Sequence, residues 1–459
     1  MLAACRGALG GALSLLPAGA AAAQLVGLAA AAAATGCRSS AAARSLHSAG
    51  PSSGEFSHVI DEHGMLVGSQ TPVTKHLWKQ RYTWTEERLQ QAAPRDPTAA
   101  AEAKPPNRLS VKYPFTSDPV VKEHYRNPWS EARIGRILED LDSLAGFVAF
   151  DHCDDGDPTT RPPLLVTATV EKIELRGKRI NLDQDMELSG RVVWTGSSSM
   201  DIVIELEQAG QQQLTSLFTF VAREPLTGAP CRIPSVLPQT PEDQALFAER
   251  QAVNAARKAA RKAGAGKLHQ VSPEGEQWAR ELLAAAKTKR DLPALADAHA
   301  VFMDDTSLSN TFTCQPEERN MHGRIFGGFL MRRAFELAHS TAYLFAGCRP
   351  LTVEVDGITF RRPVNVGDLI RFRSWVLRSW PSQHTPGKGV VHVQVEASVT
   401  QPEKLQSEVT NQFGFRFIFD LRRDQWGTLQ MPRQVLPGAE QQALEVAQRF
   451  GPGAKQPAP

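Results

Sequence analysis

Two stretches of this chain repeat the same order of elements, a helix followed by several strands. In residues 130–146, apolar side chains recur at three- and four-residue spacing, which predicts a helix with one buried face: Ile134, Ile137, Leu138, Leu141 and Leu144. Residues 320–338 pass from a glycine-bearing loop into a second predicted helix. A buried helix followed by strands, present twice, predicts an α+β fold of two similar modules.

Each predicted helix is followed by segments in which apolar and polar side chains alternate. In residues 390–399, Val391 and Val393 share one face, while His392 and Gln394 share the other. This alternation predicts antiparallel strands that can wrap the helix of their module. The predicted strands lie in 166–175, 186–195, 201–208 and 214–223, and then in 351–364, 368–377, 390–399 and 411–421.

The composition fits a folded, soluble protein. The chain has 459 residues, enough for two or three domains, with 42% hydrophobic and 22% charged residues and a formal net charge of +2. This small net charge gives no reason to expect nucleic acid as a partner. The six cysteines are scattered without a close pair, so we expect neither a zinc cluster nor a redox dithiol, and no metal or other cofactor.

The first 54 residues differ from the rest of the chain. They are rich in alanine, leucine, glycine and serine, carry Arg6, Arg38 and Arg44, and contain no acidic residue. This pattern predicts an organelle transit peptide, for the mitochondrial matrix or alternatively for a plastid. The uncharged run 7–36 is long enough to span a bilayer, but it is mostly alanine and glycine and contains Pro17, so we expect no stable membrane insertion.

The second module carries an ordered set of short motifs. Gly327 and Gly328 open its helix, residues 356–364 read DGITFRRPV, and Gly367-Asp368 open the next strand. With the strings RIGRILEDLDSLAG and RNMHGRIFGGFLMRRAFELA, this order resembles hotdog-fold thioesterases, and specifically the mitochondrial acyl-coenzyme A thioesterase 9 family. The resemblance covers roughly residues 108–421.

The resemblance implies tandem hotdog domains, each an antiparallel sheet wrapped around a central helix. It also implies an acyl-CoA hydrolase that acts on fatty acyl-CoA and assembles as a homo-oligomer of double-hotdog chains. We therefore divide the sequence into a transit peptide (1–54), an N-terminal extension or linker (55–107), hotdog domain 1 (108–233), a helical linker (234–300), hotdog domain 2 (301–422) and a C-terminal tail (423–459).

Thioester hydrolysis needs donors for the oxyanion and a carboxylate that activates water or attacks directly. Gly327 and Gly328 place unpaired amides and the positive end of a helix dipole at one point, which suits the oxyanion. Alternatively, the two glycines only allow the helix to pack tightly against the sheet. In paired hotdog modules the acid comes from the opposite helix. If Gly135 is matched to Gly328, Asp142 falls where the resemblance to thioesterases of this fold implies the catalytic aspartate, and an alignment shifted by one position favours Asp140.

Other candidates lie around this turn. Asn320 could polarise the water or the carbonyl, or it could cap the loop. Arg324, Arg361 and Arg362 are candidates for binding the phosphates of coenzyme A, although a solvated surface is the ordinary role of each.

The reciprocal site, built from the first loop and Glu336 of the second helix, has Arg136 in place of one glycine, so we predict one working site for each module pair. Two alternatives to a thioesterase remain open at this point. One is a hotdog acyl-CoA hydratase, which would need a catalytic histidine placed beside an acid. The other is a non-catalytic acyl-CoA-binding or sensor protein, because a fold alone does not fix a function.

Overall fold

The computed structural model describes residues 70–79, 92–93, 102–157, 159–175, 179–262, 271–292, 299–320 and 323–452. All of these belong to one compact unit that begins at Ser53. The predicted transit peptide, residues 1–54, lies outside the described residues.

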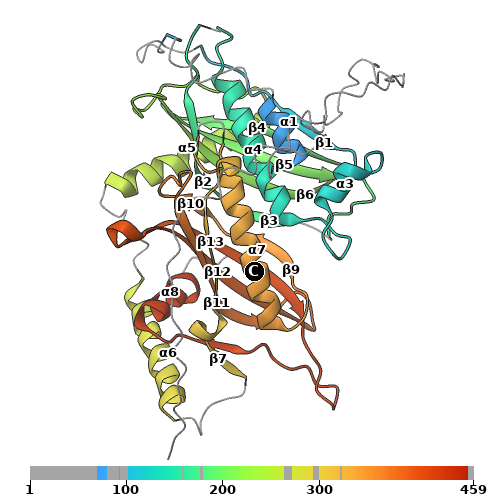
Figure 1. Ribbon diagram of the computed structural model, residues 1–459, viewed down its shortest axis with the longest axis vertical. Coiled ribbons are helices and arrows are strands. Elements are labelled where there is room, and N and C mark those ends of the chain that lie inside the picture. The colour runs from blue at the N-terminus through green and yellow to red at the C-terminus, as the bar shows by residue number, and fades with distance from the viewer. Residues whose placement is uncertain are drawn as a thin grey trace, which may run out of the picture. The chain divides into compact units, whose positions relative to one another are not determined.

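The same order of elements occurs twice, as a short strand, a 20-residue helix, two short strands and three long strands (Figure 1). The first copy consists of β1 (Leu109–Tyr113), α4 (Ile134–Cys153), β2 (Leu164–Val170), β3 (Ile173–Leu175), β4 (Met186–Thr195), β5 (Ser199–Gln208) and β6 (Gln211–Arg223). The second consists of β8 (Leu308–Thr313), α7 (Gly327–Ala346), β9 (Leu351–Val355), β10 (Ile358–Phe360), β11 (Leu369–Pro381), β12 (Lys388–Gln401) and β13 (Gln406–Asp420). The predicted α+β hotdog fold is confirmed.

The two sheets join into one sheet of twelve strands. Its main path runs β1-β4-β5-β6-β2-β10-β13-β12-β11-β8, and β3 and β9 pair beside this path. At the junction, Val170 of β2 lies opposite Ile358 of β10, and Ile173 of β3 lies opposite Val355 of β9. The strands that follow each central helix therefore hold the two modules in a fixed register.

The two central helices pack against each other as well as against the sheet. Gly135 makes this approach close, because a Cβ there would lie 3.1 Å from Arg332 Cγ and 3.4 Å from Phe335 Cδ1. Buried side chains of both modules form one continuous core. The N-terminus of each helix is thus brought beside the middle of the other.

Helices outside the two copies cover the outer faces of the sheet. Arg250 of α5 donates through Nε to Asp201 Oδ2 at 2.9 Å, and Arg449 of α8 forms an ion pair with Asp356. His392 and Gln394, on the polar side of β12, are therefore buried as well. The helices and short strands outside the two copies are α1 (Pro72–Lys79), α3 (Pro119–Tyr125), α5 (Pro241–Lys262), α6 (Pro273–Asp291), β7 (Ala300–Phe302), η2 (Met303–Thr306), η3 (Pro316–Glu318), η4 (Pro402–Lys404), β14 (Gln434–Leu436) and α8 (Glu440–Phe450).

The segment that the sequence marks as an N-terminal extension contains a buried helix. Val73, Leu77 and Trp78 of α1 belong to the main core, and α1 packs on α4. The prolines and small polar residues around 95–106 predict extended backbone, but they carry no information about this eight-residue helix upstream.

Within the described part of the chain, no helix is long and apolar enough to cross a bilayer. The same residues contain no group of three or more histidine, cysteine or acidic side chains placed to hold a metal ion.

Candidate active site

The glycine turn at the start of α7 is capped from the other module. Phe326, the N-cap residue, offers no side-chain acceptor to the first amides of the helix. Instead, the Gly328 N–H donates to Asp142 Oδ2 at 2.8 Å, across 186 positions of sequence. A carboxylate also suits the positive end of the helix dipole. The structure thus brings Asp142 together with Gly327 and Gly328.

Both glycines are required by close approach. A Cβ at position 327 would lie 2.9 Å from Asp142 Oδ2 and 3.2 Å from Phe360 Cε1, so a side chain there would push the carboxylate away. A Cβ at position 328 would lie 2.6 Å from a ring carbon of Phe326 and 2.9 Å from Glu139 Cα. Because Glu139 Cα is backbone, that second contact cannot be relieved by a rotamer change. The lack of a side chain at positions 327 and 328 therefore allows both the close packing of α7 on α4 and the contact between Asp142 and the Gly328 amide.

Asp142 is almost completely enclosed, with 4% of its surface exposed. Thr167 Oγ1 donates to its Oδ1 at 2.8 Å, so each carboxylate oxygen accepts one hydrogen bond. Burial raises the pKa of Asp142 to about 6, although the hydrogen bonds from Thr167 and Gly328 favour the ionised form. The group is therefore both ionised at neutral pH and more basic than an ordinary aspartate.

Thr167 is a site residue that the sequence did not single out. It lies in β2, whose pairing with β6 is irregular between Thr167 and Thr169. Such bulges often re-aim a side chain beside a functional site. The available signal was the pair of threonines within an otherwise apolar strand, LLVTATV.

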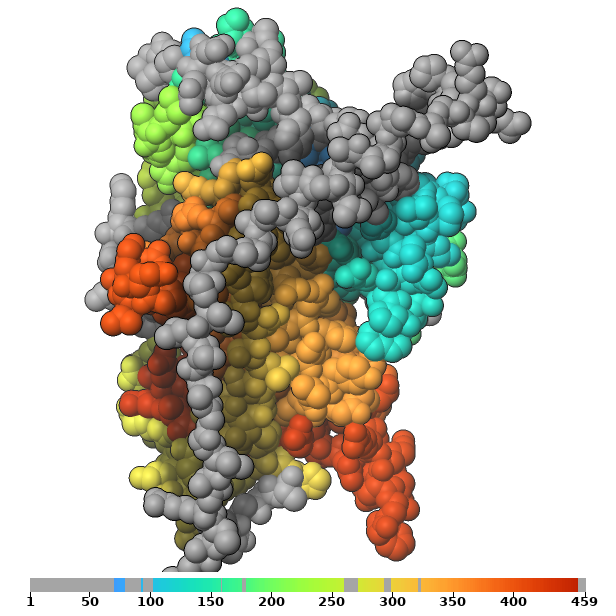
Figure 2. Space-filling model, in the orientation of Figure 1, coloured from blue at the N-terminus to red at the C-terminus, as the bar shows by residue number. Residues whose placement is uncertain are grey.

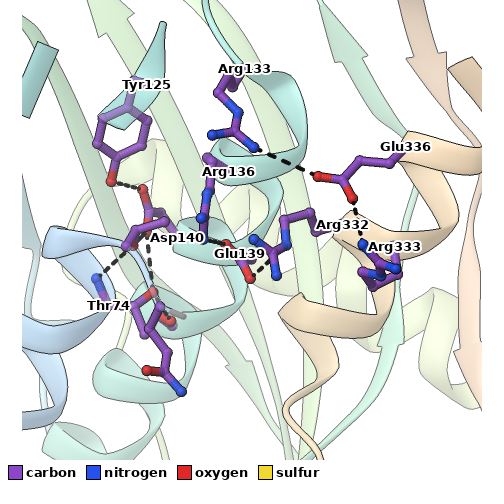
Figure 3. Close-up of polar contacts among 12 residues, drawn as sticks. Thr74, Tyr125, Arg133, Arg136, Glu139, Asp140, Arg332, Arg333 and Glu336 are labelled. Atoms are coloured by element: carbon purple, nitrogen blue, oxygen red, sulfur yellow. Dashed lines mark hydrogen bonds and ion pairs between the residues drawn. The ribbon is translucent and has the colours of Figure 1, made fainter. Parts of the chain in front are cut away.

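Asp140, the alternative acid, points to a different environment (Figure 3). Its carboxylate accepts hydrogen bonds from four hydroxyl groups that come from α1 and the residue before it, β1 and α3: Thr71, Thr74, Tyr113 and Tyr125. Burial raises its pKa to about 6 as well. Asp140 is fully buried and joins these elements to α4, so the structure does not bring it to the glycine turn.

A third acid of α4, Glu139, lies between two arginines. Its Oε2 is 2.9 Å from Arg136 Nη1, and its Oε1 is 3.1 Å from Arg332 Nε, which links α4 to α7 (Figure 3). Burial nevertheless raises the pKa of Glu139 to about 7. Both oxygens are engaged with guanidinium groups, so Glu139 serves the contact between the two helices.

The remaining predicted residues lie on the loops around the turn. Asn320 Oδ1 accepts the Arg324 N–H at 3.2 Å, so Asn320 caps the loop that leads to α7. The Arg324 side chain is exposed. Arg361 and Arg362 follow Phe360 and are also exposed; Arg361 Nη2 donates to Gln412 Oε1 at 3.0 Å, and Arg362 pairs with Glu408.

Glu336 lies at the opposite end of the helix pair, beside the N-terminus of α4. Its carboxylate is 3.8 Å from Arg133 Nη2 and 3.2 Å from Arg333 Nη1 (Figure 3). Asp142 lies seven positions after Gly135, and the residue seven positions after Gly328 is Phe335, so Phe335 takes the position equivalent to Asp142. The two ends of the helix pair therefore differ: an aspartate faces one helix N-terminus and a phenylalanine lies near the other.

The helix α1 also contacts the turn. The Trp78 ring packs edge-on against Phe326, with ring centroids 5.1 Å apart. Phe326 immediately precedes Gly327, so α1 supports the backbone whose amide meets Asp142. No periodic signal in the sequence indicated this contact.

Comparisons with known proteins show the family of the chain. A family profile described as "Thioesterase superfamily" matches residues 322–385. The chain is 40% identical to acyl-coenzyme A thioesterase 2, chloroplastic, of Humulus lupulus, over 83% of this chain and 88% of that protein. It is 42% identical to acyl-coenzyme A thioesterase 4, mitochondrial, of Humulus lupulus, over 83% and 73% respectively. It is 33% identical to human acyl-coenzyme A thioesterase 9, mitochondrial, over 68% and 72%. The predicted resemblance is confirmed, and the chain belongs to the double-hotdog acyl-coenzyme A thioesterase 9/10 family.

Proposed function

We propose that this protein hydrolyses fatty acyl-CoA to a free fatty acid and coenzyme A, at one site formed by the α7 turn and Asp142 of α4. The observation that carries this proposal is the hydrogen bond between the Gly328 N–H and Asp142 Oδ2 at 2.8 Å. It joins a backbone donor and a carboxylate from opposite modules at one point. Family membership supports the same reaction.

The turn can stabilise the charge that develops on the thioester oxygen. When the substrate binds, its thioester carbonyl oxygen replaces Asp142 Oδ2 as the acceptor of the Gly328 N–H. The Asp142 carboxylate then lies beside the carbonyl carbon of the thioester. Backbone donors at a helix N-terminus are already oriented, so they stabilise the tetrahedral oxyanion without reorganisation. Gly327 and Gly328 are the oxyanion residues in this proposal.

Asp142 is the general base. A base works best when its pKa lies near the operating pH, because it is then ionised and still accepts a proton readily. Burial brings the pKa of Asp142 to about 6, closer to neutrality than that of an exposed aspartate. Thr167 orients the carboxylate, so it is a positioning residue. Asn320 holds the loop before the turn.

Coenzyme A carries phosphates, so cations at the mouth of this site would bind it. Arg324, Arg361 and Arg362 are exposed on the two loops that flank the turn. Guanidinium groups pair with phosphate in a bidentate manner, and these three side chains are the ones we assign to that role.

Thiol release from a panel of acyl-CoA substrates tests the proposal, with Asp142→Asn compared with Asp151→Asn. Asp151 lies on the same helix and bonds Asn107, so it is a matched control for the change of charge. Loss of a general base lowers the rate by about 10²–10⁴-fold, and we expect this loss for Asp142→Asn alone. Saturable binding of acyl-CoA without turnover by the wild-type chain would instead favour a sensor. Turnover retained in Asp142→Asn but lost in Glu336→Gln would move the site to the other end of the helix pair.

The N-terminal segment supports import into an organelle. The three relatives described above are named mitochondrial or chloroplastic. The arginines and the lack of acidic residues in 1–54 favour the mitochondrial matrix, with a plastid as the alternative. A fluorescent protein fused after residue 54 would report the compartment directly, and diffuse cytoplasmic signal would contradict import.

We also propose that the double-hotdog chain assembles with further copies of itself. The main sheet ends at β1 and β8, strands of five and six residues, which leaves main-chain groups at both edges available for pairing. Light scattering on the purified chain would give its mass in solution. A monomeric mass at micromolar concentration would contradict the assembly.

A further inference from the structure

A large cavity opens at the end of the helix pair that lacks the aspartate. It has a volume of about 1060 Å³ and is lined by residues near the N-terminus of α4 and along α7, including Gly135, Arg136 and Phe335. The segments that border it are cyan and orange in Figure 2, where the two colours adjoin on one face. Pockets that bind small molecules and cofactors generally measure about 300–1,000 Å³, so this cavity can hold a ligand the size of a nucleotide or larger.

The cavity is the structural counterpart of the candidate active site. Val170 and Val355 occupy equivalent places in the sheet junction. Thr167 stands three positions before Val170, and Thr352, which lines the cavity, stands three positions before Val355. Phe335 takes the place of the acid. The same scaffold therefore provides a binding space at this end in which a phenyl ring, and not a carboxylate, stands at the position of Asp142.

Positive charge exceeds negative charge around this cavity. Each of three carboxylates is shared by two guanidinium groups, which gives six arginines for three acids. The pairs are Glu336 with Arg133 and Arg333, Glu139 with Arg136 and Arg332, and Glu131 with Arg179 and Arg349. Arg133, Arg136, Arg179 and Arg349 line the cavity itself. A guanidinium has five N–H donors, so Arg133 and Arg179, each paired with a shared carboxylate, keep donors and charge for an anion.

One wall of the cavity is aromatic. Trp129 is 41% exposed, and its ring centroid lies 6.0 Å from that of His339, which also lines the cavity. Arg349 Cζ lies 5.3 Å from the Trp129 centroid. A partly exposed indole beside guanidinium groups offers a stacking surface for a planar ring and donors for phosphates attached to it.

We infer that this cavity is a second, non-catalytic site that binds a nucleotide bearing two or more phosphates. The planar base stacks at Trp129, and the phosphates contact Arg133 and Arg179. Two sources supply this chemistry, a free nucleotide such as ADP and the nucleotide portion of coenzyme A. Occupancy of this site involves no bond cleavage. The phenyl ring of Phe335 cannot act as a base, and the Glu336 carboxylate is paired with Arg133 and Arg333.

Calorimetric titration of the whole chain with ADP tests the inference, because ADP is not a thioester and its binding does not depend on the proposed hydrolysis. We expect saturable ADP binding at one site per chain that depends on Arg133 and Arg179. The double variant Arg133→Gln/Arg179→Gln should weaken it by at least about tenfold, the scale of one lost charged contact. These side chains are 38% and 54% exposed, so the variant should fold normally, which circular dichroism checks. Arg373→Gln changes an exposed arginine of β11 that is paired with Asp304 of η2 and does not line the cavity, so it is the matched control and should bind ADP as the wild type does.

Further titrants separate the parts of the inference. Pyrophosphate lacks the planar ring, so it should bind the wild-type chain at least about tenfold more weakly than ADP does. ADP should bind the Trp129→Leu variant at least about tenfold more weakly than it binds the wild type. Coenzyme A should occupy two sites per chain, one of which is lost in Arg133→Gln/Arg179→Gln. Coenzyme A binding there more tightly than ADP would identify the coenzyme as the ligand, and the reverse order would identify the free nucleotide.

Three results would overturn the inference. The first is the absence of saturable ADP binding in the millimolar range. The second is ADP binding that survives Arg133→Gln/Arg179→Gln but is lost in Arg361→Gln, which would place the nucleotide at the catalytic mouth. The third is equal affinity for pyrophosphate and ADP, which would remove the role of Trp129. None of these results bears on thiol release, which tests the proposed hydrolysis separately.

Discussion

Replacing Asp142 by asparagine should remove activity and, at neutral pH, make the protein more stable. Asparagine keeps the shape of the side chain and can still hydrogen-bond Thr167 and the Gly328 N–H. It removes a buried negative charge whose hydrogen-bonding partners, among the described residues, are the Thr167 hydroxyl and the Gly328 N–H rather than a cation. A gain in stability together with a loss of function is expected where a site carries a strained or poorly solvated group.

The size and sign of this effect follow from the pKa of Asp142. The carboxyl has a pKa of about 6 in the folded chain against an ordinary value of 3.8, so the folded state binds the proton more tightly than the unfolded state does. The free energy of unfolding therefore falls as pH rises through this interval and is flat above it. An interval of about two pH units corresponds to about 3 kcal/mol at neutral pH.

Urea denaturation of the wild type, Asp142→Asn and Asp151→Asn between pH 4 and pH 8 measures this difference. We expect Asp142→Asn to match the wild type near pH 4 and to exceed it by up to about 3 kcal/mol above pH 7. The difference in stability between Asp151→Asn and the wild type should not increase with pH in this way. A stability difference that does not depend on pH, or a less stable Asp142→Asn at neutral pH, would refute the burial of a charged base.

Three further variants test the neighbouring contacts. Thr167→Val removes a hydrogen bond to the ionised carboxylate, worth about 1.5–3 kcal/mol, so the acidic limb of the activity profile should move about one to two pH units higher. Gly328→Ala should lower activity and cost about 1–3 kcal/mol of stability in a thermal melt, because the added Cβ meets Glu139 backbone at 2.9 Å. Asp140→Ala should destabilise the chain by about 3 kcal/mol or more, the opposite sign to Asp142→Asn, since it leaves four buried hydroxyls without their shared acceptor.

The sequence was sufficient for the parts of the fold that depend on local periodicity. The 20-residue helix α4 and the long strands, such as β12, each contain several repeats of their own pattern, so their existence was predictable. The helix α1 has eight residues, too few for a periodic signal, and its packing against Phe326 depends on contacts far apart in sequence.

The candidate site was predictable in its composition but not in its geometry. The glycine pair and the acids of α4 are visible in the sequence, but Asp140 and Asp142 differ by two positions and point to different surroundings. Only the tertiary packing shows that one meets four hydroxyls and the other meets the Gly328 amide. The cavity at the opposite end likewise depends on tertiary packing, which brings Phe335 of α7 and Arg133 at the N-terminus of α4 to the same cavity wall.

The central claim is that Asp142 acts as a base at the glycine turn of the other module, and the pH dependence of kcat/KM tests it most directly. We predict that kcat/KM of the wild-type chain rises with a midpoint near pH 6 and levels off above pH 7, because the carboxylate must be ionised to accept a proton. The residual activity of Asp142→Asn should lack this limb. A wild-type profile that is flat between pH 5 and pH 8, or the same midpoint in Asp142→Asn, would contradict the claim.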